Sequence, residues 1–207
     1  MPSPAAEPSV MGMPNTAERW TADRVRALPE DGQRYELIDG LLIVTPAPRG
    51  VHQVAVSALE RLLEGELARS PLHILHSPAD LSLGEDEVLQ PDLFVYRTAT
   101  GEHLLDWSDI TALELVVEVL SPSTARYDRQ VKRRRYQRAG VAEYWIVDLD
   151  ARVIERWRPG DERPEVLADR LRWSPGGGLS VEIDVEGFFA RLWQDSPTPG
   201  DPEHGRE

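Results

Sequence analysis

Two residue types are missing or nearly missing from this chain of 207 residues. It has no cysteine, which excludes a disulfide framework, a thiolate nucleophile and a cysteine-ligated zinc site. Of its 23 basic residues only Lys132 is a lysine, so arginine carries the positive charge everywhere else. Lysine is a compact ammonium whose pKa shifts readily when its surroundings change. The one position that keeps it is therefore a candidate for chemistry.

Long apolar runs and a basic charge balance are also missing. No stretch approaches the roughly 20 apolar residues of a membrane span, and the N-terminus lacks the pattern of a signal peptide. We therefore expect a cytoplasmic protein with no membrane segment. The net charge of −13 argues against binding nucleic acid through a broad basic face. A nucleic-acid function would need a local basic patch or metal ions.

Composition divides the chain into three parts. Residues 1–16 and 194–207 are rich in proline and small or polar residues without periodicity, and we expect both to be disordered tails. No internal repeat or linker interrupts the middle, so residues 17–193 are predicted to form a single domain.

Strand and helix patterns alternate along this middle part. Asp39-Gly40 lies between two β-prone runs, which predicts a hairpin over residues 34–45. Helical spacing of Val54, Ala58, Leu62 and Leu63 predicts an amphipathic helix over 51–69. The fold class is thus α/β, with a mixed central sheet flanked by helices and an N-terminal hairpin. The remaining expected elements are helices at 21–29, 127–139 and 185–193 and strands at 72–76, 79–83, 93–96, 113–120, 143–148, 152–158 and 165–168.

Three carboxylates stand inside or beside strands that are otherwise apolar. In Leu113–Leu120, alternation places Leu113, Leu115, Val117 and Val119 on one face and leaves Glu118 among apolar neighbours on the other. A buried charge there needs a raised pKa, an arginine partner or a metal ion. Asp92 begins the strand after Pro91, where an Asx turn or cap is the alternative explanation. Glu36 lies within the first hairpin strand, and its alternative is a solvated outer face.

The strand of Glu118 is followed by the most basic segment of the chain. Its cations are Arg129, Lys132, Arg133, Arg134, Arg135 and Arg138. One explanation is a solvated helix face, on which Asp128 and Lys132 pair at the surface for a few tenths of a kcal/mol, roughly. The other is the local positive patch that a phosphate backbone needs.

Carboxylates and a lysine are the parts that metal-assisted phosphodiester cleavage requires. Mg²⁺ prefers oxygen ligands and often takes one or two carboxylates while keeping several waters. The ion activates water and stabilises the oxygens of the displacement. A neighbouring lysine can orient that water and offset the developing charge.

The combined motifs are similar to those of one known family. They are Tyr35–Gly40, His52 near a helix start, Pro91-Asp92, Val116–Ser123, Asp128, Lys132, Tyr136, Gly140-Val141 and Glu143–Asp148. Together they resemble the Uma-type family of bacterial proteins assigned as restriction endonucleases, a branch of the PD-(D/E)XK nuclease superfamily. The resemblance spans about residues 20 to 190.

The resemblance implies a restriction-endonuclease-like core, a Mg²⁺ cofactor (with Mn²⁺ as a possible substitute) and DNA as the substrate. By position, Asp92 and Glu118 resemble the superfamily's aspartate and (D/E), and Glu36 its additional acidic residue, so these three are the expected metal ligands. The pattern expects lysine two residues after Glu118, but Leu120 stands there. Lys132 on the next helix is the expected substitute, which makes the catalytic set Glu36, Asp92, Glu118 and Lys132.

Several alternatives stay open at this stage. The chain is either a Mg²⁺-dependent DNA endonuclease or a non-catalytic interaction or assembly module that retains the nuclease fold. His52 is either a proton relay at the mouth of the site or a helix-end histidine. Homodimerisation is expected by analogy only. Near-isosteric changes of Asp92 or Glu118 are predicted to remove ion binding without lowering metal-free stability, since grouped carboxylates repel one another.

Overall fold

A computed structural model describes residues 19–29, 31–45, 48–84, 86–102 and 104–194 of the chain. Both predicted tails lie outside the described residues, apart from Gln194, which ends the last helix. No helix among the described residues is long and apolar enough to span a membrane.

The N-terminal part forms as the sequence predicts. Helix α1 (Ala22–Arg26) begins at Thr21, whose side chain caps the amide of Arg24. Strands β1 (Arg34–Ile38) and β2 (Leu41–Thr45) pair antiparallel. Asp39 and Gly40 both have positive φ, 52° and 76°, as a two-residue hairpin turn requires. The predicted hairpin is confirmed, and it belongs to a four-stranded sheet with β4 (Leu81–Gly84) and β5 (Glu87–Leu89).

A second sheet of six strands forms the centre of the molecule. Its order is β10-β9-β8-β7-β6-β3, and β7 and β8 are parallel while the other neighbours are antiparallel. This is the mixed central sheet that the sequence predicts. The strands are β3 (His73–His76), β6 (Leu93–Thr98), β7 (Ile110–Val119), β8 (Glu143–Asp148), β9 (Val153–Trp157) and β10 (Glu165–Leu167).

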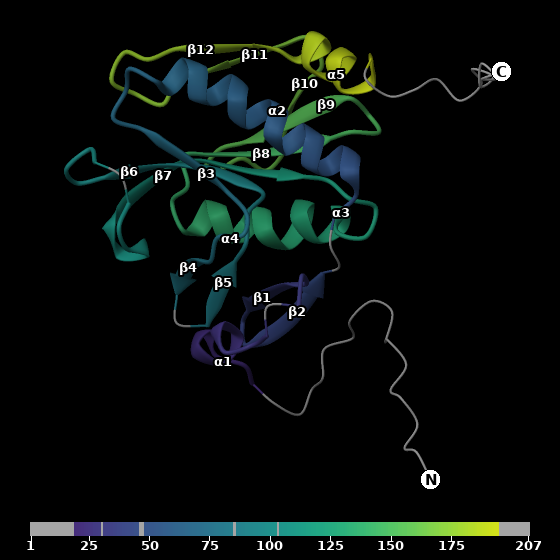
Figure 1. Ribbon diagram of the computed structural model, residues 1–207. Helices are drawn as coiled ribbons and strands as arrows, with labels where there is room; N and C mark the ends of the chain where they lie inside the picture. The colour runs from purple at the N-terminus through teal and green to yellow at the C-terminus, as the bar shows by residue number, and fades with distance from the viewer. Residues whose placement is uncertain (1–18, 30, 46–47, 85, 103, 195–207) are drawn as a thin grey trace, which may run out of the picture.

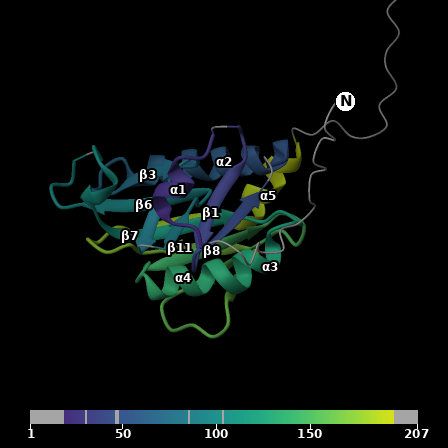
Figure 2. The ribbon, with the colours of Figure 1, turned by 90° about the horizontal axis from the view of Figure 1, so that it is seen from below.

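Helices cover both faces of the central sheet. Helix α2 (Gly50–Leu67) lies on one face and the segment that contains α4 (Arg133–Arg138) on the other, as Figures 1 and 2 show from two directions. Helix α5 (Val185–Gln194) and the two-stranded sheet of β11 (Arg170–Trp173) and β12 (Val181–Asp184) lie on the α2 side (Figure 1). The four-stranded sheet lies below the central sheet, beyond α4 (Figure 1).

Two apolar cores lie on the two faces of the central sheet, and a small third cluster packs α1 against β1 and β5. The larger core joins α2, α5, β11 and β12 to the central sheet and contains Trp145, Trp173 and Phe188. The smaller core lies on the other face, around Tyr136 and Tyr144. Strands β5, β11 and β12 and the short 3₁₀ helix η1 (Trp107–Asp109) were not anticipated from the sequence.

The apolar faces predicted for α2 and β7 each include one residue that does not lie on that face. Val54 is half exposed, and the buried side of α2 instead carries Ala55, Val56, Leu59 and Leu63. In β7 the pairing passes from Val95↔Leu115 to Tyr96↔Leu113, so Glu114 is an extra residue opposite β6. This bulge turns Leu113 to the smaller core, while Leu115, Val117 and Val119 face the larger one.

The basic segment is not one regular helix. It consists of a short turn α3 (Ala125–Tyr127), a π-helical segment η2 (Asp128–Lys132) and α4. The amide of Arg133 donates to the carbonyl of Asp128, one residue further back than in an α-helix. Such π turns occur frequently at functional sites.

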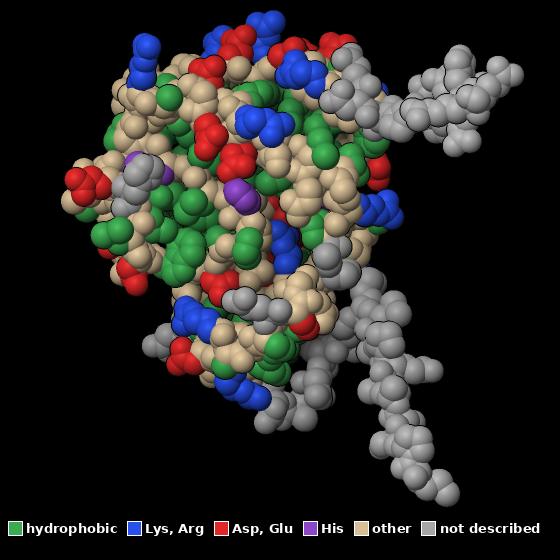
Figure 3. All heavy atoms as spheres, in the orientation of Figure 1, with side chains coloured by type: hydrophobic (Ala, Val, Ile, Leu, Met, Phe, Trp, Pro, Cys, Tyr) green, Lys and Arg blue, Asp and Glu red, His purple; other side chains and the backbone are tan. Residues whose placement is uncertain are grey.

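Charges of both signs alternate on the surface. Figure 3 shows Lys and Arg side chains interspersed with Asp and Glu, without a continuous basic area on the face displayed. Several arginines of the basic segment pair internally: Arg129 with Asp148 and Glu155, and Arg135 with Asp39 and Glu87. The segment therefore presents less free positive charge than its sequence indicates.

Candidate active site

The antiparallel pair β6–β7 brings two of the predicted residues, Asp92 and Glu118, to one end of the central sheet. Leu93 at the start of β6 pairs with Val117 near the end of β7, so Asp92 and Glu118 come from adjacent strands. Glu36 comes from β1 in the other sheet, and Lys132 from η2. All four line one cavity of about 220 Å³, and each is only 2–3% exposed. The structure thus brings together side chains that are up to 96 positions apart in sequence.

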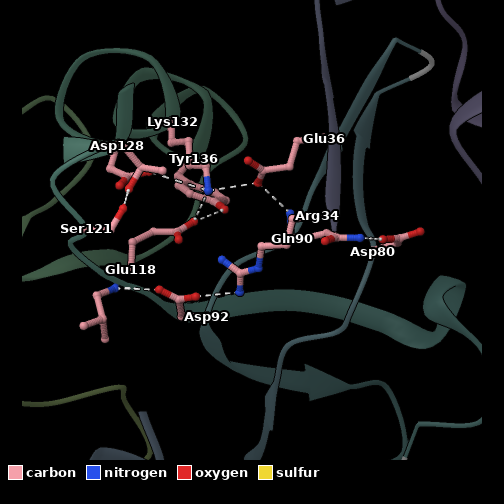
Figure 4. A network of polar contacts seen from close by, with 12 residues as sticks. Arg34, Glu36, Asp80, Gln90, Asp92, Glu118, Ser121, Asp128, Lys132 and Tyr136 are labelled. Carbon is pink, nitrogen blue, oxygen red and sulfur yellow. Dashed lines mark hydrogen bonds and ion pairs between the residues drawn. The ribbon is translucent and has the colours of Figure 1, made fainter. Parts of the chain in front are cut away.

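Lys132 lies at the centre of the group. Its Nζ is 2.9 Å from Oε1 of Glu36, 2.9 Å from Oε1 of Glu118 and 3.6 Å from Oδ1 of Asp128 (Figure 4). The three carboxylates outweigh the effect of burial and hold the pKa of Lys132 well above its usual range. Lys132 is thus a fixed cation, and the predicted surface pair with Asp128 is wrong because both residues are buried.

Asp92 is held by three donors at the start of β6. Arg34 donates to Oδ1 at 2.6 Å, the backbone amide of Val119 donates to Oδ2 at 2.7 Å, and His52 Nε2 lies 3.0 Å from Oδ2. Burial alone would raise the pKa of Asp92, but His52 and Arg34, with a smaller contribution from Lys132, lower it to about 2. Its carboxylate is therefore charged at neutral pH.

The pKa of Glu118 is shifted in the opposite direction. Its Oε1 accepts hydrogen bonds from Lys132 at 2.9 Å and Tyr136 at 3.1 Å. Burial raises the pKa of Glu118 well above its usual range, and the neighbouring carboxylates add to this against the opposing effect of Lys132. Burial likewise raises the pKa of Asp128, whose Oδ1 is buried without a hydrogen-bond partner.

The site contains four buried carboxylates, which we call the acidic cluster: Glu36, Asp92, Glu118 and Asp128. Within the part of the chain that the structure describes, two permanent cations, Arg34 and Lys132, contact these four carboxylates. Fully ionised, the cluster would keep two negative charges in excess. Burying uncompensated charge is costly, so the cluster must take up protons or positive ions.

The oxygens of the acidic cluster suit a hard divalent cation. Glu118 Oε2 and Glu36 Oε2 have no hydrogen bond or ion pair to any described residue, and both side chains line the cavity. No three acidic or histidine side chains among the described residues are placed to hold an ion together. Mg²⁺ needs fewer, because it commonly binds one or two carboxylates and keeps its waters. The donor set therefore fits a partly hydrated Mg²⁺ or Mn²⁺ ion.

Three members of the site were not assigned to it from the sequence: Arg34, Asp128 and Tyr136. His52, for which a place at the mouth of the site was one of two alternatives, lines the cavity and contacts Asp92. The spacing of some of these residues in the sequence could have indicated that they belong to the site. Arg34 precedes Glu36 by two residues on one strand, which places both on the same side. Asp128, Lys132 and Tyr136 recur at intervals of four, which places them along one helix face.

The alternative explanations for single residues can now be compared with the geometry. Glu36 is buried, so it is not a solvated outer-face residue. Asp92 accepts from Val119 on another strand rather than capping its own turn. Glu118 pairs with lysine instead of arginine. His73 contacts the carbonyl of Gly101, and His76 contacts Glu60, both away from the acidic cluster.

Comparison with known proteins points to one family. A solved structure described as a putative nuclease belonging to DUF820 from Anabaena variabilis ATCC 29413 superposes with a TM-score of 0.66 at 21% identity, covering 83% of this chain and 98% of the other. That likeness shows the fold. No curated protein matches the chain. The sequence model of the Uma2 family, described as "Putative restriction endonuclease", matches residues 22–186. The chain therefore belongs to the Uma2 family and has its nuclease-like α/β fold.

Proposed function

We propose that this protein is a metal-dependent endonuclease that hydrolyses DNA phosphodiester bonds with Mg²⁺ or Mn²⁺. The observation that supports this most strongly is the acidic cluster with its buried ammonium. Four carboxylates and two fixed cations line one cavity, and a divalent cation would neutralise the two excess negative charges. A purely structural ion-pair network would not need such an excess.

Asp92 and Glu118, with Glu36 beside them, would hold the metal ion. A divalent ion bound there would polarise the phosphate and lower the pKa of a bound water. Asp92 is suited to this because Arg34, His52 and Val119 fix its orientation. Glu118 is suited because one of its oxygens is occupied by Lys132 and Tyr136 while the other has no described partner.

Lys132 would stabilise negative charge at the reacting phosphate. Its raised pKa means that it keeps its proton, so it is unsuited to act as a general base. Glu36 and Glu118 hold the ammonium from two sides at 2.9 Å, and Asp128 lies farther away at 3.6 Å, so the third N–H is the one that would turn to the substrate or a water. A preorganised donor of this kind requires no rearrangement during the reaction.

A cleavage assay on plasmid and on single-stranded DNA tests the proposal. We expect products with Mg²⁺ or Mn²⁺, none with EDTA, and none from Glu118→Gln. The internal pairing of Arg129 and Arg135 and the net charge of −13 favour the alternative of a non-catalytic binding module. Absence of cleavage by the wild type with every divalent ion tried would support that alternative.

A further inference from the structure

A second cavity opens beside the acidic cluster and has no role in the chemistry proposed above. It measures about 270 Å³, and we call it the side chamber. It shares Arg49, His52, Ser121 and Pro122 with the cavity of the acidic cluster. The two cavities therefore lie next to each other and share part of their walls.

The walls of the side chamber are suited to a planar group. Val51, Leu120, Pro122 and Leu149 supply aliphatic surface, and Trp193 supplies an aromatic ring. Trp193 is 37% exposed, although a tryptophan at the end of an amphipathic helix could have been buried. Cavities for drug-sized ligands measure about 300–1,000 Å³, so this chamber is of a size for about one nucleoside.

Polar groups lie where a nucleic-acid backbone would pass between the chambers. Arg49 lines both cavities and makes no ion pair or side-chain hydrogen bond with any described residue, unlike Arg129, which pairs with Asp148 and Glu155. His52 also lines both, and its Nδ1 is buried without a hydrogen-bond partner. Nε2 faces Asp92, so the imidazole is fixed at the wall that the two cavities share.

The depth of the acidic cluster limits which DNA can reach it. Its side chains are only 2–3% exposed, as is Lys132, and the surface shown in Figure 3 has no continuous basic area for a duplex. A paired duplex keeps its bases stacked inside and presents its phosphates on a convex surface. A single strand can be threaded into a narrow cavity, and its unstacked bases can pack on aromatic side chains.

From these observations we propose that the side chamber binds the nucleoside next to the scissile phosphate, and that the substrate is single-stranded or locally unpaired DNA. The scissile phosphate lies at the acidic cluster, the neighbouring base packs on Trp193, and Arg49 contacts the backbone between them. The placement of a scissile phosphate rests on the proposed nuclease function, but base binding in the side chamber can be measured without cleavage.

Binding is measured by fluorescence anisotropy of a labelled single-stranded oligonucleotide with Ca²⁺ in place of Mg²⁺. Stacking on an aromatic side chain contributes about 1–3 kcal/mol per base, so Trp193→Ala should weaken binding by about fivefold or more. Trp107→Ala is the matched control, because Trp107 is similarly exposed at 44% and lies outside both cavities. Ala151→Trp, which fills the chamber from its exposed rim, should weaken binding as well. Because this variant keeps Trp193, it tests the proposal even if Trp193→Ala does not fold.

Cleavage rates are then compared for one sequence as a single strand, a duplex with an unpaired bubble and a full duplex. We expect the first two to be cut at least tenfold faster than the full duplex. Equal rates on all three, or oligonucleotide binding that neither Trp193→Ala nor Ala151→Trp weakens, would overturn the proposal. Loss of binding in both variants without any cleavage by the wild type would refute the nuclease function and leave the nucleoside site standing.

Discussion

Asp92 and Glu118 come from neighbouring strands and line the same cavity, yet their surroundings are opposite. Asp92 has a guanidinium, an imidazole and a backbone amide as partners, and its pKa is lowered to about 2. Glu118 shares a single ammonium with two other carboxylates, and its pKa is raised. Two buried acids that lie close together can therefore have pKa values shifted in opposite directions. The direction depends on how many cations and other donors contact each acid.

The contrast separates two tasks within one site. Fixed partners hold Asp92 in one orientation, so the protein itself stabilises that carboxylate. Glu118 and Asp128 are the places where positive charge is lacking, so they make the cluster receptive to an added cation. The following predictions test this division, starting from the largest effect.

Lys132→Arg should produce the largest change, in the rate of cleavage. A guanidinium is larger and planar, and it cannot occupy the same point between Glu36 and Glu118. Loss of one positioned electrostatic group costs about a hundredfold to a thousandfold in kcat, while divalent-ion binding should survive. Arg134→Lys, a cation exchange at an exposed position of the same segment, is the control and should leave the rate unchanged. An undiminished rate in Lys132→Arg would show that any cation suffices.

Asp92→Asn should destabilise the metal-free protein. The change leaves the partly buried Arg34 beside a neutral amide, and removal of one partner from a fully buried pair typically costs about 3–5 kcal/mol. We expect somewhat less, about 2–3 kcal/mol, because the amide oxygen can still accept one hydrogen bond. Urea unfolding in EDTA measures this. Unchanged stability would mean that the partners of Asp92 stabilise its charge no better than those of Glu118 do, which would contradict the proposed difference between the two acids.

This expectation differs from the one drawn from the sequence. Repulsion among grouped carboxylates predicts that neutralising either Asp92 or Glu118 preserves metal-free stability. Arg34, which the sequence did not place at the site, and His52, whose place was left open, change the prediction for Asp92 alone.

Glu118→Gln should leave the stability of the metal-free protein within about 1 kcal/mol of the wild type, or raise it. The substitution removes a charge that burial and nearby carboxylates disfavour, and Lys132 keeps Glu36 and Asp128 as partners. The same urea experiment applies. A loss as large as that of Asp92→Asn would identify Glu118 as one half of a structural ion pair.

Mild acidification should slightly stabilise the metal-free wild type. Because the folded-state pKa of Glu118 is raised, the folded protein binds that proton more tightly, and stability rises as pH falls from the raised pKa toward about 4.5. Asp92 acts in the opposite sense, since its lowered pKa makes its contribution disappear as pH falls from about 4 to about 2. Melting temperatures between pH 4.5 and 8 should therefore decline with pH in the wild type and less so in Glu118→Gln. Equal slopes in the two proteins would contradict the raised pKa.

Much of the fold follows from local pattern. Asp39-Gly40 predicts the hairpin, and the apolar run around Val116 and Val117 predicts a central strand. The bulge at Glu114 and the π segment at Asp128–Lys132 depend on how strands and helices pack against one another. No local pattern signals them, so the facing of Leu113 and the burial of the Asp128–Lys132 pair were predicted wrongly.

The residues of the candidate site could largely be predicted from the sequence, but their pKa shifts could not. An acid in an apolar strand and a lone lysine single out Glu118 and Lys132 from the sequence. Which cation faces which acid depends on long-range contacts, such as that between Arg34 and Asp92, 58 positions apart. The separate charge states of Asp92 and Glu118 were accordingly not predictable before the structure.

Calorimetric titration of Mn²⁺ into the wild-type protein and into Glu118→Gln, in buffers of different ionisation enthalpy, tests the central claim most directly. The claim is that the acidic cluster lacks positive charge and a divalent cation supplies it. We predict binding by the wild type with release of protons, because the ion replaces those held by carboxylates of raised pKa. Glu118→Gln should bind much more weakly or not at all. No binding by the wild type, or equal binding by both proteins, would contradict the claim.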